Sequence, residues 1–109
     1  MYTVDLHLKK ETVDTAIANL YSSINIARRT KEKLICLIVG YGSTGGTHKI
    51  KTAIENELNE LKNKNQIKGF INGNELDIFN VKYQNFKYKM LLTEEVKRSK
   101  NPGAVYIIL

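Results

Sequence analysis

A continuous apolar run, a group of glycines and a helical pattern follow one another between Lys33 and Leu61. The run KLICLIV has the length of a buried strand, and the segment GYGSTGG after it is typical of a tight loop. Beyond the loop, apolar residues recur at intervals of three and four, as on one face of an amphipathic helix: Ile50, Ala53, Ile54, Leu58 and Leu61. The pattern therefore predicts a strand, a glycine-rich loop and a helix, in that order.

Two elements are expected before this run. The alternation from Tyr2 to Leu6 predicts a first strand. A helix should then begin at Glu11 or Thr12. Its predicted buried stripe consists of Val13, Ala16, Ile17, Leu20, Tyr21, Ile24 and Ala27.

The chain after the second helix has a weaker pattern. Between Leu76 and Leu92, aromatic residues and lysines mix without a clean period. Such a mixture suits base stacking with phosphate binding, or a loop whose rings cover the edge of the core; we prefer the loop. The other expected elements are a strand at Ile67–Ile71, a turn at Asn72–Gly73, a helical turn at Thr93–Lys100, a turn at Pro102–Gly103 and a strand at Ala104–Leu109.

The order strand, helix, strand, helix, strand, strand predicts an α/β fold, in which helices pack on a small sheet. The first two strands should be parallel, and parallel strands place a ligand site at their carboxyl ends. Asp5 and His7 end the first strand, while Gly40 and Gly42 end the second. We therefore expect these four residues at the same edge of the sheet.

Composition limits the class of protein. A chain of 109 residues with 42% hydrophobic and 26% charged residues is expected to form one globular domain. No apolar run approaches the ~20 residues of a membrane helix, and no signal pattern is visible, so we expect a cytoplasmic protein without membrane contact. Cys36, the single cysteine, lies in the apolar run and is predicted to be a core residue. The net charge of +6 favours polyanionic partners.

The glycine loop has the spacing of two nucleotide-binding motifs but the context of neither. GYGSTG fits the dinucleotide pattern GxGxxG, yet it follows a second strand, and Glu60 falls within a helix rather than at a strand end. A Walker A loop would need Lys where the chain has Gly46. What remains is an anion site of main-chain amides at a helix start, or only a tight turn. The predicted phosphate-binding residues are Gly40, Tyr41, Gly42, Ser43, Gly45, Gly46, His48, Lys49 and Lys51.

Asp5 and His7 are the candidate catalytic residues. An imidazole titrates near neutral pH, so His7 is suited to proton transfer on a phosphodiester. Asp5 is suited to orienting His7, accepting a proton or helping to hold Mg²⁺ or Mn²⁺; on RNA, activation of the 2′-hydroxyl by His7 needs no metal. No zinc site is expected, because no pair of ligands has zinc-like spacing. The alternative is two polar residues that only face solvent.

Three segments together resemble one known family. They are VDLH at residues 4–7, GYGSTGGTHKIK at 40–51 and NPGAVYIIL at 101–109, and they look like the small MutS-related (Smr) domain. The resemblance implies a two-layer α/β sandwich with a small mixed sheet, similar to the C-terminal domain of translation initiation factor three. It also implies binding to DNA or RNA, and often endonuclease activity. The Asp and His of the family's L-D-x-H motif fall on Asp5 and His7, and its G-x-G motif falls on Gly40 and Gly42.

Two hypotheses about function follow from these observations. The first is an Smr-type endonuclease that nicks DNA or RNA. The second is a non-catalytic module that binds nucleic acid or associates with the ribosome, and two departures from the family pattern favour it. Leu8 stands where the family commonly has Gly, and Val39 stands where it commonly has His or Thr. A third hypothesis is a small anionic ligand on the glycine loop.

Overall fold

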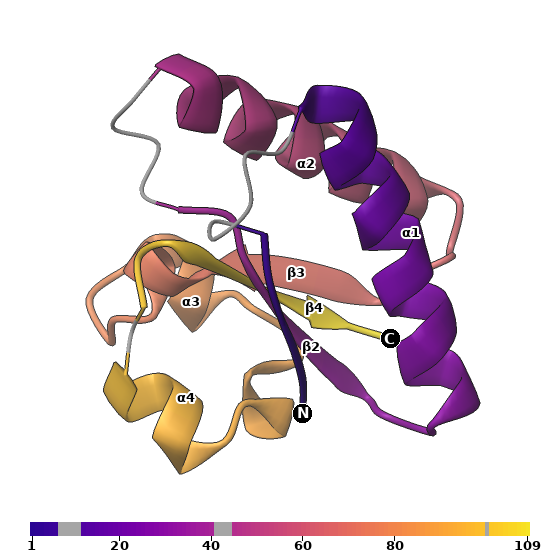
Figure 1. Ribbon diagram of the computed structural model, residues 1–109. Coiled ribbons are helices and arrows are strands. Elements are labelled where there is room, and N and C mark those ends of the chain that lie inside the picture. Colours follow the sequence, from indigo (N-terminus) through magenta and orange to yellow (C-terminus); the bar gives the residue numbers. More distant parts are fainter. Residues whose placement is uncertain (7–11, 41–44, 100) are drawn as a thin grey trace.

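The computed structural model describes residues 1–6, 12–40, 45–99 and 101–109 (Figure 1). The predicted α/β fold and the order of its strands and main helices are confirmed. Within the part of the chain that the structure describes, four short helices lie between the third and fourth strands: the helical turn predicted at Thr93–Lys100 is confirmed as α4 (Glu94–Ser99), whereas the sequence pattern did not separate the other three. The elements are β1 (Tyr2–Asp5), α1 (Val13–Arg29), β2 (Leu34–Ile38), α2 (Gly45–Asn63), β3 (Gly69–Asn72), η1 (Gly73–Glu75), α3 (Val81–Gln84), η2 (Lys89–Leu91), α4 (Glu94–Ser99) and β4 (Ala104–Ile108).

The four strands form one mixed sheet in the order β1-β2-β4-β3. β1 and β2 are parallel, as predicted, and their register pairs Asp5 with Ile38. β4 is antiparallel to β2 on one side and to β3 on the other. The last strand in the chain is therefore a central strand, while β1 and β3 are the two edges.

α1 begins where a polar side chain satisfies its first free amides. The Thr12 hydroxyl accepts a hydrogen bond from the Thr15 main-chain N–H, and the Thr15 hydroxyl accepts one from the Thr12 N–H. The predicted stripe is buried at most positions, but Val13 and Tyr21 are 37% and 41% exposed, so their predicted burial is wrong. Both lie at the margin of the stripe, and the Tyr21 hydroxyl instead donates to Glu57 on α2.

The larger part of the core lies between α1, α2 and one face of the sheet (Figure 1). Leu20 and Leu58, from the two helices, are fully buried there, and each such side chain contributes about 1.5–3 kcal/mol by leaving water. The other members of this cluster are Leu6, Ala16, Ile24, Ala27, Ile35, Leu37, Val39, Ile54, Leu61, Ile67, Val105 and Ile107. These two helices and the sheet form the expected two-layer sandwich.

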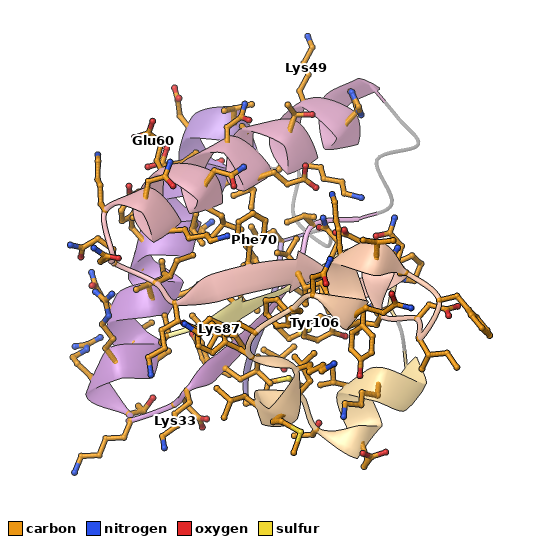
Figure 2. All side chains as sticks on the ribbon, turned by 180° about the vertical axis from the view of Figure 1, so that it is seen from behind. Lys33, Lys49, Glu60, Phe70, Lys87 and Tyr106 are labelled. Atoms are coloured by element: carbon orange, nitrogen blue, oxygen red, sulfur yellow. The ribbon has the colours of Figure 1, made fainter. Side chains whose placement is uncertain are left out.

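The opposite face of the sheet is covered by the segment from η1 to α4. Cys36 is buried in this second cluster, as predicted, together with Tyr106 and Val96. The rings of Tyr83, Phe86 and Tyr88 pack against the cluster and are partly buried: this agrees with our preference for rings that cover the edge of the core. Figure 2 shows Tyr106 on this side of the sheet. All five residues of β4 are buried because both faces are covered.

Two sequence expectations are shifted in position. The third strand, expected at Ile67–Ile71, is Gly69–Asn72, since Ile67 turns into the core before the strand begins. The expected turn at Asn72–Gly73 is the start of η1. Among the described residues, no helix is long and apolar enough to cross a membrane.

Gly73, the most tightly enclosed of Gly69, Gly73 and Gly103, gives a stability prediction. A Cβ atom on Gly73 would lie 1.7 Å from the main-chain oxygen of Asn101, so Gly73→Ala forces two backbone segments apart. We expect a loss of about 1–3 kcal/mol in the free energy of unfolding, measured by urea denaturation.

The matched control is Gly69→Ala, whose Cβ would meet the rings of Phe86 and Tyr88 at an ordinary 3.4 Å. We expect this variant to remain within about 1 kcal/mol of the parent. Equal stability of the two variants would contradict the close approach at Gly73.

Candidate nucleic-acid interface

The carboxyl ends of β1 and β2 meet at one edge of the sheet. Asp5, the last residue of β1, pairs with Ile38, the last residue of β2. The main-chain N–H of Leu6 then donates to the Ile38 carbonyl at 2.9 Å. The edge predicted for Asp5 and Gly40 is therefore the one observed, because parallel strands bring their carboxyl ends together.

The start of the glycine loop is fixed by the turn that precedes β4. The N–H groups of Val39 and Gly40 both donate to the Gly103 carbonyl, at 2.8 and 3.1 Å. Gly40 has a φ of 92°, which is strained for any residue with a side chain. A Cβ on Gly103 would lie 3.2 Å from the Gly40 carbonyl carbon, so the two segments approach closely. The Asn101 side chain holds this turn by accepting from the Gly103 N–H at 2.9 Å.

α2 begins at Gly45 and brings positive charge to the same side of the loop. Its first turn contains no acidic residue. His48 and Lys49 are exposed, and Lys49 extends from the helix into solvent in Figure 2. Lys51 is half-buried. The partial positive charge of the helix start and these side chains together favour an anion at this place.

The carboxylate of Asp5 lies on the face of the sheet opposite to α1 and α2. Its neighbours in the register, Cys36 and Ile38, belong to the second cluster, whereas Leu6 points into the first. The pKa of the Cys36 thiol agrees with this placement, because the charge of Asp5 acts on it. Burial raises the pKa of Cys36, a hydrogen bond with Tyr106 lowers it, and the negative charge of Asp5 raises it.

Several predicted site residues lie outside the described residues. They are His7, Tyr41, Gly42 and Ser43. The pairing of Asp5 with His7 and the amide cradle of the loop therefore stay predictions. Among the residues that the structure describes, no three His, Cys, Asp or Glu side chains gather as metal ligands.

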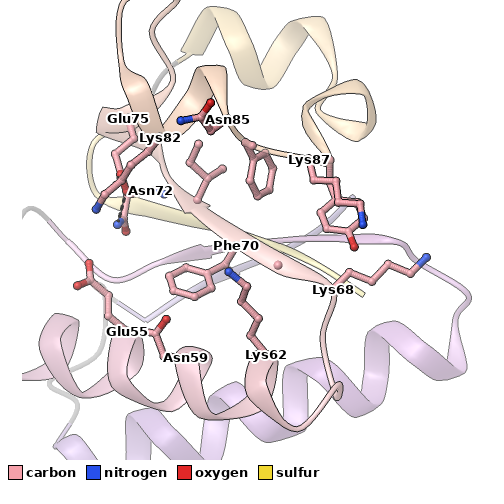
Figure 3. Close-up of a pocket in the computed structure, with 14 residues that line it drawn as sticks. Glu55, Asn59, Lys62, Lys68, Phe70, Asn72, Glu75, Lys82, Asn85 and Lys87 are labelled. Atoms are coloured by element: carbon pink, nitrogen blue, oxygen red, sulfur yellow. Dashed lines mark hydrogen bonds and ion pairs between the residues drawn. The ribbon is translucent and has the colours of Figure 1, made fainter.

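A second feature was not predicted from the sequence. A cleft of about 580 Å³ runs between α2 and the segment after β3, with β3 itself between its walls (Figure 3). The mixture of lysines and rings at Leu76–Leu92 was the only signal for it. Figure 3 shows Phe70 on the α2 side of the strand. The sequence did not indicate that Phe70 lines a cleft, because the hydrophobic pattern does not reveal that β3 is an edge strand.

The fold is similar to that of a known domain. The crystal structure of the Smr domain of Thermus thermophilus MutS2 matches with a TM-score of 0.62 and 17% sequence identity, over 100% of this chain and 98% of that chain. No protein-family model matches the sequence, and no curated protein matches it. At this identity the likeness concerns the fold alone. The chain has the fold of an Smr domain, and so the fold that the motif resemblance implied is confirmed.

Cys36 gives a pH prediction. Because its pKa is raised in the folded protein, the unfolded chain loses the thiol proton first as the pH rises. The stability contributed by the neutral thiol is complete below its ordinary pKa of about 8.5 and is lost as the pH rises from there towards the folded pKa. We expect the unfolding free energy of the parent to fall relative to that of Cys36→Ala, by at most about 1.4 kcal/mol per pH unit.

Urea denaturation of both proteins between pH 7 and pH 10.5, roughly spanning the thiol's range, measures this difference. The Cys36→Ala variant is the matched control, because it removes the thiol and keeps every other ionisable side chain of the protein. A difference that stays constant across this range would contradict the raised pKa.

Proposed function

We propose that this protein binds nucleic acid at the sheet edge formed by the carboxyl ends of β1 and β2, together with the start of α2, and hydrolyses a phosphodiester there. The observation that supports this most strongly is the meeting of Asp5 and the end of β2 at one sheet edge, in a fold that matches an Smr domain over the full chain. The resemblance of the motifs at residues 4–7 and 40–51 to that family supports the same edge.

Electrostatics support a phosphate at this place. The chain has a net charge of +6, and the α2 start with Lys49 adds local positive charge without an acid in its first turn. In the proposal the loop at residues 40–46 and Lys49 or Lys51 hold the phosphate. They also stabilise the negative charge that develops on its oxygens during the reaction.

The proposed chemistry is proton transfer. His7 takes a proton from the attacking water, or from the adjacent 2′-hydroxyl of RNA, as the new oxygen–phosphorus bond forms. The bond from phosphorus to the leaving oxygen breaks, that oxygen takes a proton from a solvent water, and the His7 imidazolium then returns its own proton to solvent. Asp5 orients His7 and balances its positive charge.

One observation favours a second candidate function, a non-catalytic module that binds nucleic acid. Val39, where the Smr family commonly has His or Thr, is only 3% exposed and packs in the core. Its N–H is also used by the Gly103 carbonyl. No polar side chain is therefore available at position 39 to contact a phosphate or a water, while the anion site at α2 is unaffected.

The catalytic proposal predicts a separation of cleavage from binding. Asp5→Asn with His7→Ala should lower the cleavage rate by roughly 100-fold or more, since general acid–base catalysis is lost, while nucleic-acid binding stays within about threefold. Labelled single-stranded RNA, duplex DNA and branched DNA, each with and without magnesium or manganese, provide the substrates. Asp77→Asn, an exposed carboxylate on the loop after η1, is the matched control and should cleave like the parent.

Two results would decide against the catalytic assignment. A double variant that cleaves as fast as the parent would remove Asp5 and His7 from the reaction. A parent protein that binds all three nucleic acids but cleaves none of them would support the non-catalytic module.

The binding surface gives a separate prediction. Lys49→Glu with Lys51→Glu should weaken nucleic-acid binding by about tenfold or more and reduce its salt dependence, because phosphate contacts are lost. Lys31→Glu with Lys33→Glu makes the same change of charge at the amino end of β2 and should stay within about threefold. Fluorescence anisotropy over a range of salt concentrations measures both. Equal weakening by the two pairs would mean that only net charge matters.

A further inference from the structure

The outer edge of β3 has no strand beside it. β3 is the last strand in the sheet order, and within the described residues only β4 pairs with it. A free edge presents unpaired main-chain N–H and C=O groups, which are a template for another strand. Proteins usually cover such edges or make them repel other strands.

The cleft follows this edge. Five consecutive residues of the chain, from Lys68 to Asn72, line it. Side chains alternate between the two faces of a strand, so consecutive residues can line one cleft only if the edge of the strand is part of its surface. Figure 3 shows α2 with Lys62 on one side of β3, and the segment with Asn85 and Lys87 on the other.

The direction of the main-chain groups is given by a hydrogen bond at the end of β3. The Asn72 N–H donates to the Glu75 side chain at 3.3 Å, so it points away from β4. Main-chain groups alternate in direction along an antiparallel strand, and residues two apart point the same way. The N–H and C=O of Phe70 therefore point into the cleft, where one donor and one acceptor face an incoming chain.

The charge of the cleft is mainly positive. Its charged residues are Lys62, Lys68, Lys82, Lys87, Glu55 and Glu75. The Glu75 carboxylate already has partners within the protein: it accepts a hydrogen bond from the Asn72 side chain and lies 3.2 Å from the Lys82 ammonium. Among the described residues, Lys62, Lys68 and Lys87 form no ion pair; Lys87 lies 6.0 Å from the centre of the Tyr88 ring.

We propose that this cleft binds an extended acidic segment of a partner protein, which adds to the sheet as a strand beside β3. The edge offers both donors and acceptors, which match a polypeptide main chain, whereas a nucleic-acid backbone has phosphate acceptors but no N–H donors. The unpaired lysines select acidic side chains. A second copy of this chain is disfavoured, because two such edges would bring their lysines together.

Two side walls provide contacts for alternate side chains of the added strand. Phe70 lies on the α2 side (Figure 3) and packs against the first cluster, whereas the edge-to-face pair Phe86 and Tyr88, with ring centres 6.0 Å apart, packs against the second cluster on the other side. Because Gly69 has no side chain, the rings of Phe86 and Tyr88 lie close to the main chain of β3. A Cβ atom on Gly69 would lie only 3.4 Å from both rings. Apolar residues between the acidic ones should therefore strengthen binding.

The test uses a capped, dye-labelled peptide of about ten residues, composed of Glu, Val and Thr, and the same peptide with every main-chain nitrogen methylated, so that neither edge can donate. Methylation removes N–H donors and leaves the charge unchanged. We expect the methylated peptide to bind the protein at least about tenfold more weakly in fluorescence anisotropy, and the Phe70 amide to become protected from hydrogen exchange only with the unmethylated peptide.

Paired variants separate this site from the nucleic-acid edge. Lys62→Glu with Lys87→Glu should weaken peptide binding at least about tenfold and leave nucleic-acid binding within about threefold. Lys49→Glu with Lys51→Glu should have the opposite effect. Phe70→Pro, which removes the outward N–H but keeps the ladder to β4, should also lose the peptide while circular dichroism shows a folded protein.

Three results would overturn the proposal. Equal binding of the two peptides would mean that charge alone attracts them. Displacement of the peptide by a single-stranded oligonucleotide, with loss of oligonucleotide binding in Lys62→Glu with Lys87→Glu, would make the cleft a nucleic-acid site. If the folded parent does not bind the unmethylated peptide, the β3 edge does not bind an acidic strand and the proposal is wrong.

Discussion

Two hydrogen bonds to one carbonyl hold the candidate edge together. The N–H groups of Val39 and Gly40 donate to Gly103, and so the end of β2 is joined to the turn before β4. Through this contact the direction in which the loop leaves the sheet depends on a turn more than sixty residues later in the chain. Both glycines are needed: Gly40 for its φ of 92°, and Gly103 for its close approach. α2 begins five residues after Gly40, so this main-chain contact fixes the start of the connection between β2 and α2.

Local pattern was sufficient to predict the framework. The apolar run at β2, the alternation at β1 and the helical spacing of α2 each have one dominant period, and the structure has these elements within one or two residues. The segment from Leu76 to Leu92 has no such period because it packs as short turns, whose rings insert between elements of the second cluster. Val13 and Tyr21 were misplaced because helical spacing gives the direction of a stripe but not its width.

The two sites differ in how far sequence could predict them. Asp5 and Gly40 were placed at one edge correctly, since parallel pairing of consecutive strands follows from the helix between them. The polar neighbours of Asp5 were harder to predict from the sequence than its place at the edge. Cys36 and Tyr106 lie on the same face as Asp5 only because of the register of three strands. The cleft at β3 depends on strand order, which is a long-range property. Lys62, Lys68 and Lys87 come from separate segments, and nothing near any one of them in the sequence indicates the others.

The central position of β4 has a consequence for how the chain folds during synthesis. β1 with β2 can form early, but β3 contacts the rest of the sheet only through β4, at residues 104–108. Until these residues leave the ribosome, β3 has no neighbouring strand and β2 can pair only with β1. The two ladders that include β4 can therefore form only after residues 104–108 are available. A partner that covers the free side of β3 at that stage would also shield it from aggregation.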